Sequence, residues 1–226
     1  MEERYRLFDA TLASLNEAGA LSSLILVGSW CQHLYRFAFG DPEEIPALIT
    51  SDIDFLIPHH GQITRDINIS ELLESLGFAL VISPVEHFTK YIRRELEVEF
   101  LVSETGRGRD KPHDIKKLHI NAQGLRYLLM LQENTETLPY KTIPVRLAAA
   151  EAYVLHKFLI SGKRAKPEKR EKDLAAAVQL GEYLVRLEDR AMNMKKILAS
   201  IHPRWRRDIL KTIGEQSVQL YKILNI

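Results

Sequence analysis

The sequence predicts an α+β fold, in which a small mixed β-sheet with flanking helices is followed by a C-terminal helical bundle. Two observations predict it. Up to residue 146, short apolar segments of strand length alternate with amphipathic segments of helix length. Beyond that point, apolar residues recur mainly at helical spacing. We therefore expect an α/β domain over residues 1–146 and a helical domain over residues 147–226.

The elements of the first domain follow from apolar periodicity and from the residues that end each run. Tyr5, Phe8, Leu12 and Leu15 form one stripe at helical spacing, which Gly19 ends, and this predicts a helix at 3–17. By the same reasoning we expect further helices at 30–37 and 68–76, and strands at 24–27, 51–57, 78–82, 88–93 and 95–102.

The remainder of the chain is mainly helical in pattern. Trp205, Ile209 and Ile213 recur at helical spacing, which predicts a buried helix face. Residues 162–169 are charged and contain Pro167, so we expect a solvated linker there. The expected elements are a helix at 123–131, a strand at 142–146, a helix at 148–161 and three or four helices over 170–226.

Composition excludes several classes of protein. With 46% hydrophobic and 27% charged residues, the chain has enough apolar side chains to bury a core. The net charge of +1 makes no global case for nucleic acid binding. No apolar run approaches the roughly 18 residues of a membrane span, and the charged start is unlike a secretory signal. The single cysteine, Cys31, excludes an internal disulfide, so we expect a cytoplasmic protein without membrane contact.

Two aspartates in an apolar run are the most informative feature of the chain. Asp52 and Asp54 flank Ile53 within the segment 51–57. Alternate residues of a strand point to one face, so their carboxylates lie on the same face, about 7 Å apart along the strand. Holding two like charges together is costly unless a cation neutralises them. The pair therefore predicts a site for a divalent cation, Mg²⁺ or Mn²⁺.

A glycine and a serine connect the preceding strand to the next helix. Gly28 permits close approach of the backbone to a ligand, and the free N–H groups at the start of a helix attract phosphate. Ser29 is expected to cap this helix with its side chain. The turn is therefore a candidate phosphate-binding site.

A third acidic residue is expected from the strand at 95–102. Glu97 and Glu99 alternate with apolar residues, so they share a face, and either completes a three-carboxylate cluster if the two strands are neighbours. Mg²⁺ favours carboxylates together with phosphate oxygens, and two such ions clamp the oxygens of an in-line displacement. This pattern predicts phosphoryl or nucleotidyl transfer.

These motifs, in this order, resemble the polymerase-β-like nucleotidyltransferase superfamily. The resemblance rests on Val27–Ser29, Thr50–Phe55 and Val98–Phe100. Further segments are similar to a bacterial nucleotidyltransferase-fold group related to the AbiE- and MenA-type toxin nucleotidyltransferases: Ile143–Val145, Leu155–Ile160 and Lys172–Leu174. The resemblance spans about residues 24–185 and implies a nucleotidyltransferase fold.

The resemblance implies roles for the matching residues. Gly28 and Ser29 would meet the β- and γ-phosphates of a nucleotide, and Asp52 and Asp54 would bind the metal ions. Glu99 would be the third metal-binding carboxylate and would help to activate the incoming hydroxyl.

Two downstream residues complete the implied site. Lys157 and Asp173 match a lysine and an aspartate of the toxin-like branch, the lysine facing nucleotide phosphate, and we count both as nucleotide-binding and Lys157 also as catalytic. The chain departs from the family pattern in the long interval between Gly28 and Asp52. The third acid is ambiguous between Glu97 and Glu99; the apolar neighbours of Glu99 favour it.

The expected function is therefore metal-dependent transfer of a nucleoside monophosphate from a nucleoside triphosphate to a hydroxyl, with release of pyrophosphate. RNA, a protein and a small molecule remain open as acceptors, and the oligomeric state is undetermined. One alternative is a regulatory or antitoxin-like module of the same fold without turnover. A less favoured one is a glycosyltransferase that uses its Asp-x-Asp pair to bind Mn²⁺ and a nucleotide sugar; the Gly-Ser turn and the short chain argue against it.

Overall fold

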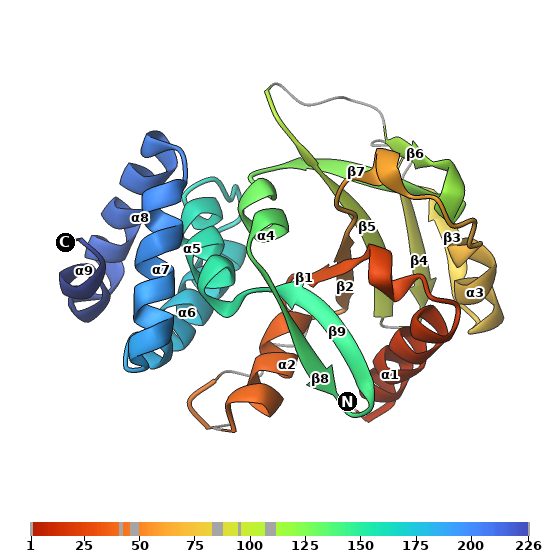
Figure 1. Cartoon of the computed structure of the whole chain (residues 1–226), viewed down its shortest axis with the longest axis horizontal. Helices are drawn as coiled ribbons and strands as arrows, with labels where there is room; N and C mark the ends of the chain where they lie inside the picture. Colours follow the sequence, from red (N-terminus) through yellow and green to blue (C-terminus); the bar gives the residue numbers. More distant parts are fainter. Residues whose placement is uncertain are drawn as a thin grey trace.

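A computed structural model describes residues 2–40, 43–45, 50–82, 88–94, 96–106 and 112–225. Figure 1 shows a sheet-bearing part followed by a group of C-terminal helices. The described strands are β1 Ile25–Val27, β2 Asp52–Leu56, β3 Ala79–Ile82, β4 Thr89–Arg93, β5 Leu96–Glu104, β6 His113–Ile115, β7 Ile120–Arg126, β8 Thr135–Tyr140 and β9 Ile143–Ala148. The described α-helices are α1 Glu2–Glu17, α2 Trp30–Phe39, α3 Ile69–Ser75, α4 Leu129–Glu133, α5 Ala150–Ser161, α6 Pro167–Leu184, α7 Glu188–Ser200, α8 Pro203–Gln216 and α9 Val218–Leu224.

The sheet is mixed, and its central pair of strands is parallel. Its main path runs β3-β4-β5-β2-β1-β9-β8, with β7 pairing to the far end of β5 and β6 pairing to β7. The pairs β2–β5, β1–β9 and β5–β7 are parallel, whereas β1–β2, β3–β4, β4–β5, β6–β7 and β8–β9 are antiparallel. One face of β2 and β5 is apolar and fully buried through Ile53, Phe55, Val98 and Phe100. The opposite face of the same strands carries the acidic residues.

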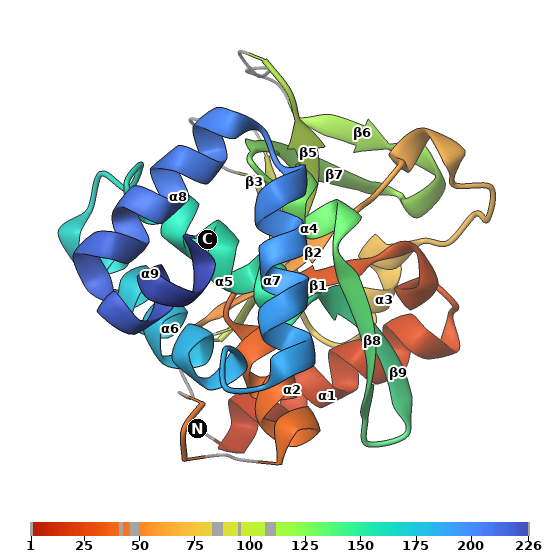
Figure 2. The same cartoon turned by 60° about the vertical axis from the view of Figure 1, so that its left-hand side comes forward.

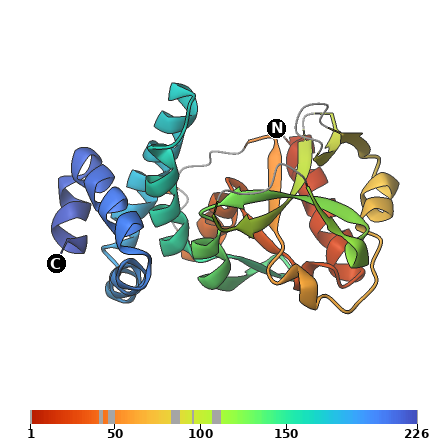
Figure 3. The same ribbon diagram turned by 90° about the horizontal axis from the view of Figure 1, so that it is seen from above.

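The C-terminal helices pack around α5. This helix contacts α6, α7 and α8 (Figure 2). Ten of its twelve residues are buried. Seen from above, α6 to α9 form a layer beside the sheet-bearing part, with α5 between them (Figure 3). Buried apolar side chains form one continuous core from Leu7 in α1 to Leu224 in α9, so the two parts share a core.

The structure confirms the α+β class and most expected elements. The expected helix at 3–17 is α1, the strand at 51–57 is β2, and the segments at 88–93 and 95–102 form the antiparallel pair β4–β5, with Glu95 outside the described residues. The sheet ends with β9 at Ala148 and α5 begins at Ala150. This change lies close to residue 146, while the division into two domains stays a prediction.

The expected helix at 123–131 is wrong. Residues 120–126 form strand β7, and only Leu129–Glu133 is helical. Strand β7 pairs with residues 101–104 of β5. Strand β2 ends opposite Leu101, so the backbone groups of β5 beyond this residue need another strand as partner. Gly124 lies against the Glu104 side chain, where a Cβ atom would come within 2.2 Å of a carboxylate oxygen. Long-range pairing therefore overrides the local helical pattern.

Other differences are smaller. Strand β8, whose sequence is polar and contains Pro139, was not expected from the sequence. Proline is tolerated here because β8 is the edge strand of the main path. The expected linker at 162–169 is shorter, because α6 already begins at Pro167, whose fixed φ suits the first position of a helix. As expected, Ile209 and Ile213 are fully buried in α8, and Trp205 packs against the core.

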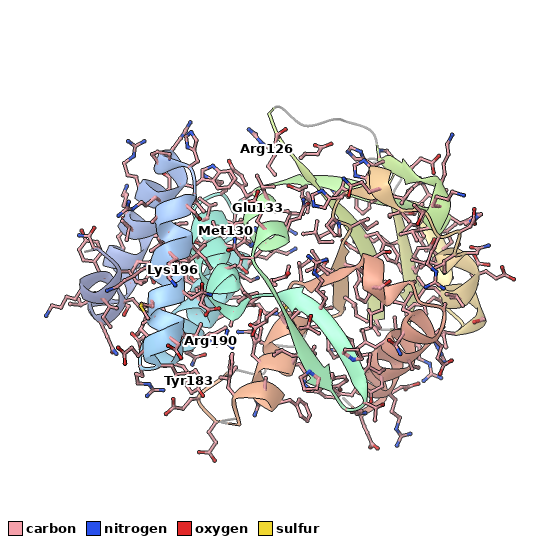
Figure 4. All side chains as sticks on the ribbon, viewed as in Figure 1. Arg126, Met130, Glu133, Tyr183, Arg190 and Lys196 are labelled. Atoms are coloured by element: carbon pink, nitrogen blue, oxygen red, sulfur yellow. The ribbon has the colours of Figure 1, made fainter. Side chains whose placement is uncertain are left out.

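A charged network joins the helical part to the sheet. Glu151 of α5 has no solvent exposure, and both its oxygens lie 3.3 Å from Nη1 of Arg190, which is labelled on α7 in Figure 4. Arg190 Nη2 also donates to Glu136 of β8 at 3.0 Å, and Asn193 donates to Glu151 at 3.1 Å. The network connects β8, α5 and α7.

We predict that Arg190→Met destabilises the protein by about 2–4 kcal/mol, because it leaves the buried Glu151 carboxylate without its cation. The matched control is Arg186→Met, in the turn before α7, whose exposed ion pair with Glu44 contributes less than about 1 kcal/mol. Urea unfolding of both variants measures the difference. Equal losses of stability would contradict a special role for the buried network.

Candidate active site

The parallel register of β2 and β5 brings the expected acidic residues together. Asp52 lies opposite Glu97, and Asp54 lies opposite Glu99. Carboxylate oxygens of Asp52, Glu97 and Glu99 all lie within 4.8 Å of one another, and this is the one such group of potential ligands among the described residues. Both glutamates thus belong to this group, whereas Asp54, an expected metal ligand, does not, and the structure leaves the choice of third acid open.

The glycine turn after β1 lies directly against Asp54. Val27 pairs with Asp54 across the antiparallel β1–β2 ladder, and Gly28 follows with a φ of 73°, a conformation that favours glycine. A Cβ atom at position 28 would come within 2.1 Å of Asp54 Oδ2. Any side chain here would therefore collide with the Asp54 carboxylate.

Burial, followed by the charges of Glu99 and Asp52, raises the pKa of Asp54 to about 7. The positive charges of Lys157 and Lys90 act in the opposite direction. A carboxylate in such a setting gains more than an ordinary one from a nearby cation, because the cation favours its charged form. Asp54 is thus the acid whose charge the metal-free protein tolerates least.

Ser29 occupies the N-cap position of α2, as the sequence predicts, but its side chain makes no capping hydrogen bond. Its hydroxyl instead shares a hydrogen bond with the hydroxyl of Thr50 and accepts one from the Thr50 N–H at 3.4 Å. Thr50 stands two residues before Asp52. The pair of hydroxyls therefore ties the start of α2 to the start of the strand that carries the aspartates.

Lys90 is part of the cluster and was not expected from the sequence. It lies opposite Glu99 on the antiparallel β4–β5 ladder, forms an ion pair with Glu99, and places its Nζ 3.2 Å from Glu97 Oε2. Burial disfavours its charged form, but the hydrogen bonds and charges of Glu99 and Glu97 outweigh burial and raise its pKa. Lys90 is therefore a cation held between two of the acids.

A second group of residues comes from the helical part. Lys157 of α5 donates to Asp173 Oδ1 of α6 at 2.5 Å, and Arg164 donates to Asp173 Oδ2 at 2.8 Å. Lys157 Nζ also lies 5.4 Å from the ring centroid of Tyr153. Both oxygens of Asp173 are thus engaged by cations, in a position that is 5% exposed.

This basic group lies within electrostatic range of the acidic cluster. Lys157 favours the charged form of Asp54. Burial and the charge of Lys157 lower the pKa of Lys172, while Asp173 and Asp52 act in the opposite direction. The α5–α6 corner therefore presents positive charge toward the acids of the sheet, an arrangement suited to a ligand that carries both a metal and phosphate groups.

Two other polar side chains near the site, Cys31 and His156, are buried. Cys31 is buried and its thiol donates to the Leu26 carbonyl at 3.2 Å, while burial raises its pKa. Burial lowers the pKa of His156 to about 3, so this histidine is neutral and packed. Sequence reasoning missed Lys90 and Arg164, which carry no local signal because only strand register and helix packing bring them to the site. Lys172 lies in the Lys172–Leu174 motif, from which no role had been assigned to it.

The donor set fits a hard divalent cation. Carboxylate oxygens converge from two strands, an ammonium group already lies between two of them, and the turn at Gly28 lies directly against Asp54. Mg²⁺ and Mn²⁺ both favour such oxygen ligands.

Comparison with known proteins agrees with this geometry. A family model described as "Nucleotidyltransferase" matches residues 7–201. The chain belongs to this family. Every residue of the acidic cluster and of the α5–α6 corner lies inside the matched range, and membership implies a nucleoside triphosphate as substrate.

Two solved structures are similar to this chain, and the first shares its fold. An antigenic nucleotidyltransferase-like protein from Paracoccidioides brasiliensis is similar with a TM-score of 0.51 and 17% identity, over 96% of this chain and 92% of that one. The antibiotic-resistance factor ANT(2'')-Ia gives a TM-score of 0.41 and 14% identity, over 84% of this chain and 94% of that one. No curated protein sequence matches the chain. Across the described residues, each helix is too short or too polar to span a bilayer.

We predict that, without metal, Asp54→Asn is more stable than the wild type at pH 8 and that this difference shrinks as the pH falls to 5. Asp54 has a pKa of about 7 when folded and near 4 when unfolded, so in the wild type the folded state binds an extra proton in this interval and gains on the order of 1–2 kcal/mol from it. His33 and His156, whose pKa values are lowered, destabilise both proteins alike as the pH falls, so the difference between the two proteins reports Asp54. Thermal unfolding in EDTA measures both effects.

The exposed Asp114→Asn is the matched control and should keep the wild-type pH dependence. If Asp54→Asn follows the same pH profile as the wild type, Asp54 is not the group that titrates.

Proposed function

We propose that the protein is a metal-dependent nucleotidyltransferase that moves a nucleoside monophosphate from a nucleoside triphosphate to a hydroxyl group, releasing pyrophosphate. The observation that carries this proposal is the placement of Asp52, Asp54 and Glu99 on one face of two parallel neighbouring strands, beside the Gly28 turn. Family membership supports the same general reaction.

Each residue at the sheet has a proposed part in the reaction. Asp52 and Asp54, with Glu99 or Glu97, hold Mg²⁺ or Mn²⁺, which would neutralise phosphate charge and polarise the reacting oxygens. The backbone at Gly28 and Ser29, at the start of α2, receives the β- and γ-phosphates. Glu99 accepts the proton of the acceptor hydroxyl as its oxygen attacks the α-phosphorus. The bond from that phosphorus to the bridging oxygen of pyrophosphate breaks.

The α5–α6 corner supplies positive charge to the nucleotide. We propose that Lys157 contacts its phosphates. Asp173, whose two oxygens already accept hydrogen bonds from Lys157 and Arg164, acts on the nucleotide by orienting these two cations. This refines the expectation of a direct contact between Asp173 and the nucleotide.

Several finer features also belong to the proposal. A relation to the AbiE- and MenA-type toxins, and a cytoplasmic location, rest on the motif resemblance and on the single buried cysteine. RNA, a protein and a small molecule remain candidate acceptors. The second candidate function, a regulatory module without turnover, is favoured by one observation: Lys90 neutralises part of the acidic cluster.

We predict that the protein incorporates label from an α-³²P-labelled nucleoside triphosphate, with Mg²⁺, into purified bacterial RNA or into itself. Asp52→Asn and Asp54→Asn should each reduce incorporation by at least about 100-fold, because each removes a charged ligand from the metal site. Asp114→Asn, on exposed β6, is the matched control and should keep full activity.

Full incorporation by either site variant would remove the metal mechanism. Calorimetric binding of Mg-ATP with no product from any acceptor would favour the regulatory module instead.

We predict that Lys157→Met weakens Mg-ATP binding about tenfold, because one phosphate contact is lost while the apolar stem is kept. Asp173→Asn should weaken Mg-ATP binding less, since Lys157 keeps its charge and loses only the carboxylate that orients it. Lys163→Met, at an exposed lysine just beyond α5, is the matched control. Isothermal titration measures all three, and an unchanged affinity in Lys157→Met would place that lysine outside the nucleotide site.

A further inference from the structure

Lys90 occupies a position that a metal ion would otherwise share. Its side chain starts on β4, crosses to β5 and places Nζ between Glu97 and Glu99, in contact with both. These are two of the three residues whose carboxylate oxygens converge within 4.8 Å. The ammonium group and a divalent cation would therefore draw on the same oxygens.

The surroundings hold Lys90 in this place. The β4–β5 ladder sets it directly opposite Glu99, so the ion pair follows from the strand register. Nζ lies 5.4 Å from the ring centroid of the buried Phe88, which adds a cation–π contact. The side chain of Lys90 is 29% exposed and that of Glu99 is 14% exposed, so solvent screens this pair less than a surface pair.

The mutual repulsion of the acidic groups explains why a positive charge is held among them. Asp52, Asp54, Glu97 and Glu99 bring four acidic groups onto one face of two strands. A single ammonium group offsets part of their mutual repulsion in the absence of metal. The ammonium group also repels an incoming divalent cation and pairs with two of the carboxylates that the cation would bind.

We propose that Lys90 is a tethered cation that competes with the divalent metal for Glu97 and Glu99, so that metal binding requires the ammonium group to leave these carboxylates. The inference rests on the proposed metal site. It assigns Lys90 the role of a positioning residue that sets the metal concentration at which the acidic cluster fills.

The first test is Mn²⁺ binding to the nucleotide-free protein, measured by the electron paramagnetic resonance signal of free Mn²⁺. Lys90→Met, which keeps the stem and removes the charge, should bind Mn²⁺ about tenfold more tightly than the wild type. Lys90→Arg keeps the charge and should not bind it more tightly. Lys141→Met is the matched control, because Lys141 also forms an ion pair with one acid, Asp9, and should leave Mn²⁺ affinity unchanged.

Equal or weaker Mn²⁺ binding by Lys90→Met, with binding by the wild type intact, would overturn the role of Lys90 and leave the proposed metal site standing. No Mn²⁺ binding by either protein would overturn both. The two failures are therefore distinguishable without an activity assay.

A second measurement uses the wild-type protein and does not depend on the folding of Lys90→Met. In protein labelled with ¹³Cε-lysine, the Lys90 signal is assigned by its absence in Lys90→Arg. Saturation with Mg²⁺ should shift this signal as the ammonium group leaves Glu97 and Glu99, while the Lys141 signal should stay in place. A Lys90 signal that does not move at saturating Mg²⁺ would overturn the proposal.

Discussion

The parallel pairing of β2 with β5 is the constraint on which the site depends. It sets Asp52 against Glu97 and Asp54 against Glu99, so four acidic groups are forced onto one small area of a sheet. Their opposite face is fully apolar and buried, which prevents the strands from rotating the acids away from one another. The like charges can be relieved by cations or by protonation, but not by a change of register.

The neighbouring elements supply cations that offset the repulsion between these acids. Lys90 comes from the strand next to β5, and Lys157 comes from the helix that follows the sheet. The raised pKa of Asp54 shows that these charges compensate only in part. An acidic cluster of this kind lowers the stability of the protein without metal, and in the proposed function its unsatisfied charge is what binds a cation and its nucleotide.

The C-terminal helices contribute charge near the acids as well as side chains to the core. Lys157 lies on α5 and Asp173 on α6, the two form an ion pair, and the charge of Lys157 favours the charged form of Asp54. The buried network of Glu151 with Arg190 and Glu136 holds α5 against α7 and β8. In the proposed function the helical part forms a second wall of the nucleotide site, so loss of its packing should disturb the chemistry of the sheet.

The sequence by itself determined the α+β class, the strand that carries Asp52 and Asp54, the glycine turn at Gly28 and the run of helices after the sheet. These features depend on local periodicity and on the special backbone freedom of glycine, which neighbouring residues encode. Only the tertiary structure decided that Glu97 and Glu99 both belong to the cluster, that Lys90 bridges them, and that residues 120–126 form a strand. Each of these depends on which strands pair and in which register, and that is set by contacts between segments far apart in the chain.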